Sequence, residues 1–327
     1  MSTATVSRVV SGLGGVREAT RLRVEQAITA TGWMPDPAAR QLAGGNGDEI
    51  VLAVAVKDRH EFAGDPYYAR VVAGAHEEAA QQGLSLSVHV ARLGSLAGLK
   101  PFSRGRRYAG AILVNAGADE AARIGGLGRP VVSMGAVTAE VSSVDPENEA
   151  GVSEAVGHLL ERGRRRIATI AGPQQNPCSR ERLVGYRSRV RAAGLPEIRE
   201  GADFTRPGAA EAARRLIATT PDVDAVFVAS DLMATAVLQV LAASGRRVPD
   251  DVAVVGFDDS PPAWMSTPAL TTVHQPVEDL AALAVRTLTD RPDHPVDQRL
   301  PTHLVIRDST ALAPCADAVA VPEESDK

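Results

Sequence analysis

The stretch DAVFVASDLMATAVLQVLAASGRRVPDDVAVVGF, residues 224–257, contains two short apolar runs separated by a longer helix-like segment. The runs 224–229 and 252–257 are rich in Val and Ala, and 231–244 carries the apolar residues of a buried helix. Strands that are apolar throughout are typical of parallel sheets covered by helices on both faces. This stretch therefore predicts a strand–helix–strand unit of an α/β fold.

The same alternation continues through most of the chain. Further apolar strands are expected at 50–56, 84–90, 109–114, 131–134 and 166–171, and further helices at 68–82, 149–161, 179–193 and 208–218. This is more than one sheet accommodates comfortably. We therefore expect two α/β lobes, each built on a parallel, doubly wound sheet.

Composition narrows the class of protein. The chain has 327 residues, 44% of them hydrophobic, which is enough for a sizeable core and more than one unit. Its two cysteines, Cys178 and Cys315, form no disulfide framework and favour a reducing compartment. We see no basic leader followed by an apolar run, and no stretch of roughly 18 apolar residues. We expect a cytoplasmic protein with no membrane partner.

The first 46 residues have a different pattern. Helices are expected at 2–11 and 18–31, and a helix that begins with proline at 35–43, before the flexible joint 44–47. Residues 1–46 carry a net charge of +2, so the remainder carries −7. A mildly basic head on an acidic body is a weak indication of nucleic-acid binding.

The expected helix 2–11 has a small polar face opposite its valines. That face carries Thr3, Ala4, Ser7 and Arg8. An arginine can donate two hydrogen bonds to guanine, hydroxyls can bind phosphates, and small methyl groups can contact thymine. On periodicity alone, an ordinary amphipathic surface helix is the simpler interpretation.

Charged residues follow the expected strands of the core. Asp231 follows strand 224–229, Asp258 follows strand 252–257, and Arg182 follows strand 166–171. Ligands of α/β sheets bind at the carboxyl ends of parallel strands, and paired charged and amide groups suit a polyol. Two structural alternatives stay open: Asp231 as a helix cap, and Arg182 as an ion-pair partner of Asp258.

Several motifs resemble the lactose-repressor/galactose-repressor (LacI/GalR) family of transcriptional regulators. Residues 2–11 are similar to the family's recognition helix, 16–34 to its third helix, and 35–43 to its hinge helix. Six core segments follow in the family's order: 144–151, 166–173, 180–186, 228–234, 254–259 and 268–273. The resemblance implies a core like the type I periplasmic sugar-binding proteins, behind a helix-turn-helix head.

For the head, the resemblance implies operator DNA as the partner. Thr3, Ala4 and Arg8 would face bases, Ser2, Thr5 and Ser7 would hold phosphates, and Ala39 and Leu42 would enter the minor groove. Leu42 would be the wedge that opens a base step and bends the duplex.

One departure concerns the start of the head. The family's first helix has no counterpart before Met1, which stands where the family has Val. Because GTG encodes Val internally but Met at a start, we expect the true start to lie upstream; an in-frame stop just before Met1 would contradict this. Without that helix the valine face of 2–11 lacks its packing partner. We expect weak operator binding by the chain as written, which tight, specific binding in a gel shift would contradict.

For the core, the resemblance implies a sugar or related polyol as effector. Arg182 and Asp258 would hold its hydroxyls, and Tyr67, Tyr68 and Phe204 would supply aromatic surfaces; lesser candidates are Asn115, Asp231, Ser230 and Gln275. Tyr68 could instead be a residue of the hydrophobic core. Cys178 is interpreted as a thiol that takes no part in ligand binding. Gly135, where many members carry a charged residue, and the long loop 57–66 leave the sugar unnamed.

No catalytic pattern is found. The sequence contains no His-Glu-x-x-His, Cys-x-x-Cys or Gly-x-Ser-x-Gly motif, and residues 12–15 lack the preceding strand of a phosphate loop. We expect no enzyme activity, no metal and no cofactor. The alternatives are an exported solute-binding protein, and a ligand-binding core that has lost DNA binding through a real deletion.

The expected organisation is a homodimeric repressor of three parts. These are a head, 1–46, with the hinge helix 35–43; a core, 47–313, with an N-lobe (48–146 and 277–303) and a C-lobe (147–276 and 304–313); and a disordered tail, 314–327. Ligand closing the cleft would shift the lobes and change the separation of the paired heads.

Overall fold

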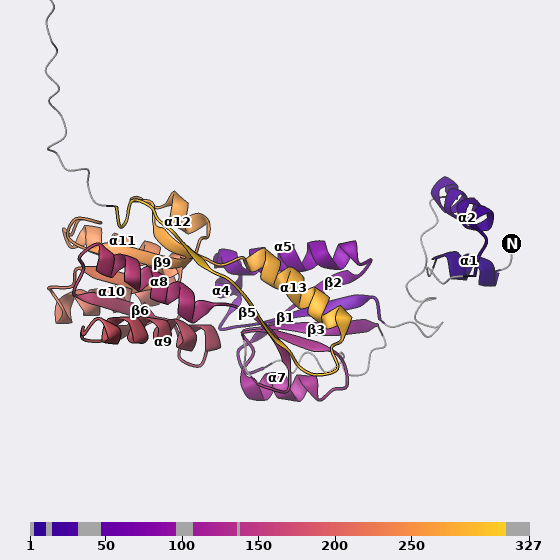
Figure 1. Ribbon diagram of the computed structural model, residues 1–327, viewed down its shortest axis with the longest axis horizontal. Coiled ribbons are helices and arrows are strands. Elements are labelled where there is room, and N and C mark those ends of the chain that lie inside the picture. Colours follow the sequence, from indigo (N-terminus) through magenta and orange to yellow (C-terminus); the bar gives the residue numbers. More distant parts are fainter. Residues whose placement is uncertain (1–2, 11–14, 32–46, 96–106, 136–137, 312–327) are drawn as a thin grey trace, which may run out of the picture.

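The computed structural model describes residues 3–10, 15–31, 47–95, 107–135 and 138–311. The core has two six-stranded sheets, each with helices on both faces, which lie end to end as two lobes (Figure 1). We call the lobe that holds β1 the N-lobe and the other the C-lobe. Strands β1 to β5 belong to the N-lobe and β6 to β10 to the C-lobe. Strand β11 then belongs to the N-lobe and β12 to the C-lobe. The chain therefore passes between the lobes three times.

The N-lobe sheet has the order β11-β5-β4-β3-β1-β2, and all its pairings are parallel. Its strands are β1 (Glu49–Val56), β2 (Ser85–Arg92), β3 (Tyr108–Val114), β4 (Val131–Met134), β5 (Ser142–Pro146) and β11 (Asp297–Leu300). Helices α5 (Pro66–Gln81) and α13 (Val277–Asp290) cover one face and α7 (Ala118–Gly125) packs on the other. The short helix α4 (Arg59–Gly64) joins β1 to α5.

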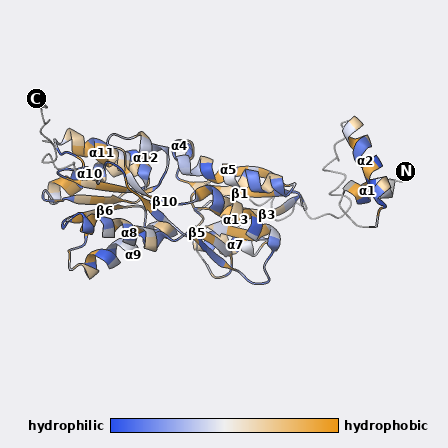
Figure 2. Ribbon diagram, turned by 45° about the horizontal axis from the view of Figure 1, so that its top comes forward, coloured by the Kyte–Doolittle hydropathy of each residue, from blue (hydrophilic) through white to orange (hydrophobic). Residues whose placement is uncertain are grey.

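Strand β1 shows why these strands are apolar throughout. Ile50 and Leu52 point toward α5 and α13, whereas Val51 and Ala53 point toward α7. Successive side chains of a strand alternate between the two faces, and both faces are covered here. The hydrophobic colour along the central strands of both lobes in Figure 2 follows from this burial. β1 begins next to the segment that leads from the head and ends at the cleft between the lobes.

The C-lobe sheet has the order β12-β10-β9-β8-β6-β7. Its strands are β6 (Ile167–Ala171), β7 (Ile198–Gly201), β8 (Ala225–Val228), β9 (Ala253–Asp258), β10 (Thr271–His274) and β12 (His303–Val305). Helices α8 (Asn148–Glu161) and α9 (Pro177–Ala192) pack against one face, and α10 (Arg206–Thr219) and α11 (Asp231–Ala243) against the other. The five-residue helix α12 (Pro261–Met265) follows β9.

The prediction of two parallel α/β lobes is confirmed, with one exception at an edge. β12 pairs antiparallel with β10. The reason is the path of the chain: β11 runs toward the cleft in the N-lobe and the chain continues without reversing into the C-lobe. The other C-lobe strands also run toward the cleft, so β12 opposes them.

The head contains helices α1 (Thr3–Val10) and α2 (Glu18–Thr31), which contact each other. Val24 on α2 is buried. The expected hinge helix 35–43 and the tail 314–327 lie outside the described residues. Among the residues that are described, no helix has the length and apolar character needed to cross a bilayer.

Candidate functional site

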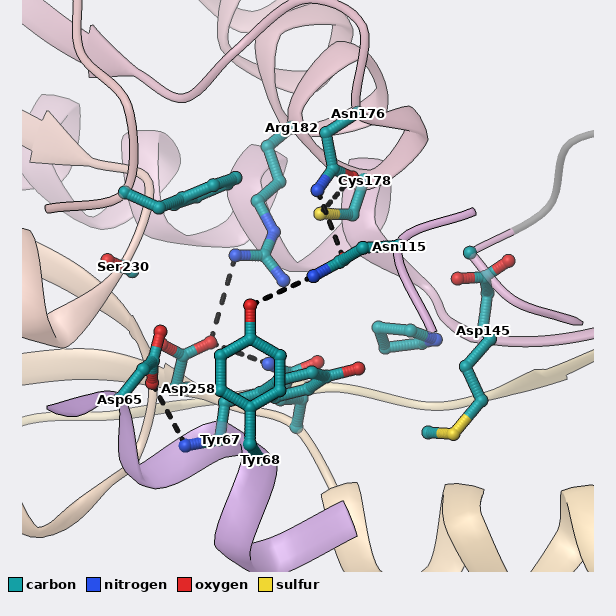
Figure 3. Close-up of a pocket in the computed structure, with 15 residues that line it drawn as sticks. Asp65, Tyr67, Tyr68, Asn115, Asp145, Asn176, Cys178, Arg182, Ser230 and Asp258 are labelled. Carbon is teal, nitrogen blue, oxygen red and sulfur yellow. Dashed lines mark hydrogen bonds and ion pairs between the residues drawn. The ribbon is translucent and has the colours of Figure 1, made fainter. Parts of the chain in front are cut away.

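A small pocket lies between the lobes, at the carboxyl ends of the strands of both sheets (Figure 3). Its volume is about 60 Å³. It is lined by Asp65, Tyr67, Tyr68, Asn115, Met134, Gly135, Asp145, Pro146, Asn176, Cys178, Arg182, Phe204, Ser230, Asp258 and Gln275. This is the position where open α/β sheets bind ligands, because loops and helix starts diverge there.

Arg182 is the central cation of the pocket. It projects from α9 and is 5% exposed. Its Nε donates to Asn148 Oδ1 at 2.9 Å, and its Nη1 donates to the carbonyl of Ala229 at 2.6 Å. Its guanidinium carbon lies 3.6 Å from the centre of the Phe257 ring, a cation–π contact. Nη1 lies 3.7 Å from Asp258 Oδ1, so the alternative of an ion pair between the two is realised.

Asp258 is the last residue of β9 and has a φ of 123°, in the region that favours glycine. Gln275 Nε2 donates to its Oδ1 at 2.5 Å. Burial raises the pKa of the Asp258 carboxyl to about 7, although Arg182 and Gln275 act in the opposite direction. A buried carboxyl held in a strained backbone is a feature typical of binding sites.

Helix α5 brings an acid and two aromatic rings from the N-lobe. Asp65 caps the helix, its Oδ1 accepting from the backbone nitrogen of Tyr67 at 2.9 Å. Burial raises the pKa of Asp65 to about 6, despite that hydrogen bond. The rings of Tyr67 and Tyr68 meet edge to face with centroids 5.6 Å apart, and burial raises the pKa of both hydroxyls.

A chain of hydrogen bonds links the two lobes beside these rings. Glu61 Oε1 accepts from the Tyr68 hydroxyl at 2.9 Å, and that hydroxyl accepts from Asn115 Nδ2 at 3.0 Å. Asn115 Oδ1 in turn accepts from Asn176 Nδ2 at 3.3 Å. Asn115, with a φ of 58°, follows the N-lobe strand β3, and Asn176 precedes the C-lobe helix α9. The lobes are therefore joined at the pocket by side chains as well as by the chain itself.

The C-lobe adds an aromatic surface and a helix cap. Phe204 has a φ of 61°, and its ring lies against Gly172, where a Cβ would overlap it. Ser230 caps α11, its Oγ accepting from the backbone nitrogen of Met233 at 3.3 Å. Both side chains line the pocket.

Asp231 is the one core candidate that the structure does not bring to the pocket. It is fully buried, and its carboxylate accepts from Thr272 Oγ1 at 2.6 Å and from Ser260 N at 2.8 Å and Oγ at 3.1 Å. These bonds tie the loop after β9 to β10, which is a structural role. Burial, with the nearby charge of Asp258, raises the pKa of Asp231 well above its usual value.

Several residues in or next to the pocket are not expected from the sequence. Asp65 was not singled out, although Asp-Pro before a helix is a capping signal. Asn148 begins α8 next to the pocket, and its Oδ1 accepts from the Nε of Arg182, which orients that guanidinium. Cys178 lines the pocket and donates to Asn176 Oδ1, and burial raises the pKa of its thiol to about 11. It is therefore a protonated thiol at neutral pH.

The head residues are described only in part. Arg8 on α1 is exposed and Thr5 is half-buried. Thr3, Ala4 and Ser7 belong to α1, and the structure describes only their backbone. Ser2, Ala39 and Leu42 lie outside the described residues.

The pocket combines a guanidinium, carboxyls, amides and aromatic faces. Such groups donate and accept hydrogen bonds in pairs and cover apolar ring surfaces, which is what a hydroxyl-rich ligand requires. Within the described ranges, no group of three or more His, Cys, Asp or Glu side chains is placed to hold a metal ion.

A two-lobed core with a ligand pocket, preceded by a helical head, defines the class of ligand-controlled transcriptional regulators. Residues 1–36 match the family of bacterial regulatory proteins, lacI family, and 156–310 match the periplasmic binding protein-like domain. The HTH-type transcriptional regulator CelR of Thermobifida fusca is 40% identical over 319 residues, covering 93% of this chain and 94% of the relative. The chain belongs to the lacI family and is a ligand-responsive, DNA-binding transcriptional regulator.

Other relatives agree with this assignment. The ribose operon repressor of Escherichia coli (strain K12) is 30% identical over 315 residues, covering 91% of this chain and 92% of the relative. A solved transcriptional regulator CelR–cellobiose complex has a TM-score of 0.73 at 36% identity, covering 94% of this chain and 96% of that chain. The lac repressor dimer bound to operator and the anti-inducer ONPF has a TM-score of 0.81 at 26% identity, covering 95% and 96%. These relatives are regulators rather than enzymes.

Proposed function

We propose that this protein is a homodimeric, cytoplasmic repressor whose effector is a sugar or related polyol bound in the pocket between the lobes. The observation that carries the proposal is the convergence of Arg182 and Asp258 with Tyr67 and Phe204 in one pocket. Arg182, Asp258, Asn115 and Gln275 would pair with hydroxyls, and the aromatic rings would cover the faces of the sugar. We propose that the protein binds the sugar without converting it chemically.

The size of the pocket bears on how a ligand enters. A dry protein cavity of about 150 Å³ holds one benzene molecule. The pocket, at about 60 Å³, is smaller than that, and a sugar ring is larger than benzene. Ligand entry therefore requires the lobes to separate or to change their relative orientation. This movement is the conformational change that binding would control.

The DNA-binding half of the proposal rests on the head. Two heads would contact a near-palindromic operator, with α1 in the major groove and the exposed Arg8 near the bases. Ligand would shift the lobes and change the separation of the heads. Coupling of this kind is typically about 1–3 kcal/mol, or roughly 5–150-fold in operator affinity. We propose residues 1–46 as the head and 47–313 as the core, divided into lobes as the sequence predicts.

One sugar is an obvious first candidate. The relative CelR is known as a complex with cellobiose and is 36% identical in that structure. We propose to begin the ligand search with cellobiose, followed by ribose, other pentoses, hexoses and nucleosides.

The decisive experiment combines two measurements on the purified chain. Isothermal titration calorimetry and thermal unfolding would identify the sugar that binds the folded state, because such a ligand raises the melting temperature. Fluorescence anisotropy on a selected operator duplex, with and without that sugar, would then measure the coupling. Binding of the sugar with no change in operator affinity would contradict the proposal. Recovery of the sugar unchanged after overnight incubation, observed by NMR, would support the absence of catalysis.

A further inference from the structure

A second, larger cavity opens beside the pocket. We call it the side chamber; its volume is about 470 Å³. It shares Asn115, Asn176 and Phe204 with the pocket, so the two cavities adjoin along one side of the inter-lobe cleft.

The walls of the side chamber carry the same kinds of group as the pocket. On the N-lobe side they include Asp119 and Arg123 of α7, and on the C-lobe side Gln175. Within the described residues, the side chains of Asp119 and Gln175 have no hydrogen-bond partner. Only the backbone carbonyl oxygens of these two residues accept hydrogen bonds there. Among the residues that the structure describes, the Arg123 Nε donates only to the backbone carbonyl of Asp119 in its own helix, at 3.2 Å. Polar groups of both signs are thus available to a ligand.

Apolar surface lies among these polar groups. Leu93 is 47% exposed although it is a large hydrophobic residue, and it lines the side chamber together with Pro173 and the Phe204 ring. An apolar wall with a few separate polar groups is the composition of small-molecule sites. For a hydroxyl-rich ligand, the apolar wall would cover a ring face and the polar groups would pair with its edge.

An ion pair forms part of the outer wall. Lys57 Nζ lies 3.0 Å from Asp203 Oδ2, and both residues line the side chamber. Lys57 follows β1 in the N-lobe, and Asp203 lies between β7 and α10 in the C-lobe. The side chamber is therefore bounded by both lobes, and a ligand in it would respond to their relative position as a ligand in the pocket does.

We propose that the effector is an oligosaccharide of two or more units, with one unit in the pocket and the following units in the side chamber. Asp119, Arg123 and Gln175 would then select its length. The difference in volume carries this inference, because the side chamber has room for a ligand and the pocket has little. The inference rests on the proposed function and specifies its effector.

Ala118 gives a steric test. It is exposed at the first position of α7 and lines the side chamber but not the pocket. Ala118→Trp would occupy part of the side chamber and leave the pocket open. Ala218→Trp, at an exposed position of α10 that lines neither cavity, is the matched control.

The probes are glucose, xylose, mannose and galactose, with their β-1,4-linked disaccharides and trisaccharides, measured by calorimetry on the full chain. We expect a disaccharide to bind the wild type at least tenfold more tightly than its monosaccharide, and the trisaccharide to bind as well. Ala118→Trp should weaken the disaccharide more than about tenfold and leave any monosaccharide binding unchanged, whereas Ala218→Trp should change neither. Gln175→Ala should weaken only the longer sugars.

The outcomes separate the two proposals. Equal affinity for mono- and disaccharide, or a disaccharide affinity that Ala118→Trp leaves unaltered, overturns the oligosaccharide inference while a sugar effector stands. Absence of binding by every sugar in this set overturns the oligosaccharide inference, and absence of binding by the wider panel of pentoses, hexoses and nucleosides as well overturns both. Binding of a disaccharide with no detectable monosaccharide binding supports the inference, provided that Ala118→Trp removes it and Ala218→Trp does not.

Discussion

Arg182 and Asp258 face each other in the pocket with Nη1 and Oδ1 3.7 Å apart, too far for a hydrogen bond. Each is held by other partners: Arg182 by Asn148 and the carbonyl of Ala229, and Asp258 by Gln275. A ligand hydroxyl placed between them could accept from the guanidinium and donate to the carboxylate at the same time. Because the two atoms of this ion pair are not hydrogen-bonded to each other, both remain able to bind a ligand hydroxyl.

The first prediction is that Arg182→Ala abolishes the response to sugar. The change removes a donor to the ligand and the cation–π contact with Phe257, and it leaves the carbonyl of Ala229 without this partner. Calorimetry should detect no sugar binding, and thermal unfolding should show a loss of about 1–3 kcal/mol for an unsatisfied buried acceptor. Arg214→Ala, at an exposed position of α10, is the control and should change neither. An unchanged sugar affinity in Arg182→Ala would remove Arg182 from the site.

A second prediction concerns pH. Burial raises the pKa of Asp65 to about 6 and that of Asp258 to about 7, both above the ordinary value of 3.8. Between pH 4 and these values the folded state binds more protons than the unfolded state, so both groups lower stability as the pH rises through this window. Asp65→Asn keeps the helix cap and should flatten the stability profile between pH 4 and 6.

Asp58 is the matched control for that experiment. It caps α4 as Asp65 caps α5, but hydrogen bonds from the backbone of Glu61 and His60 lower its pKa. The contribution of Asp58 to the free energy of unfolding therefore has the opposite sign to that of Asp65, and it is lost as the pH falls. Because the Asp58 contribution changes only as the pH falls below about 4, chemical denaturation of the wild type, Asp65→Asn and Asp58→Asn is measured from about pH 2 to about pH 8. The same change of slope in the two variants would refute the assignment of the raised pKa to Asp65.

A third prediction uses the contact between Gly172 and Phe204. A Cβ at Gly172 would overlap the Phe204 ring, whereas one at Gly201 would meet no atom within 4 Å. Gly172→Ala should displace the ring into the cleft and weaken sugar binding by about tenfold or more, with the fold retained. Gly201→Ala should bind sugar like the wild type. Equal affinities for the two variants, measured by calorimetry, would show that the position of Phe204 does not matter to the ligand.

A fourth prediction concerns the ion pair between Lys57 and Asp203. Both side chains are exposed, at 63% and 40%, so solvent and salt screen their attraction. We expect Lys57→Gln to weaken sugar binding by no more than about fivefold. The wild-type affinity should fall with added salt more steeply than that of the variant. A large loss of affinity, independent of salt, would instead indicate direct contact between Lys57 and the ligand.

The central strands and long helices could be predicted from the sequence because each of them is buried on a continuous face. β1, β8 and β9 are apolar runs, and α8 carries a stripe of buried residues at helical spacing. The shorter elements were missed for physical reasons. β5 contains Ser142 and Ser143, and β7, at the edge of its sheet, alternates between half-buried and exposed residues. Neither is a continuous apolar run.

A site residue could be predicted from the sequence where its place at or after the carboxyl end of an apolar strand was enough to bring it to the pocket. Asp258 ends β9 and Arg182 lies on the helix that follows β6, and both are in the pocket. Asn176 and Asn115 are 61 positions apart and meet only because the lobes are close together, which no local pattern indicates. Asp231 follows a strand in the same way as Asp258, but its carboxylate turns back toward Thr272 and Ser260. Strand position alone does not distinguish these two orientations.

Strand β1 spans the N-lobe from the end nearer the head to the cleft. It has eight residues, about 25 Å at roughly 3.3 Å each, and it runs from the side of the head at Glu49 to the cleft at Val56. A tilt of about 10° at the cleft would swing its far end by about 4 Å, or about 8 Å between two subunits moving in opposite senses. Successive half-sites on DNA are about 34 Å apart, so such a swing would shift the heads by about a quarter of a helical turn. A rotation too small to disturb either hydrophobic core would thus be enough to put the heads out of register with the operator.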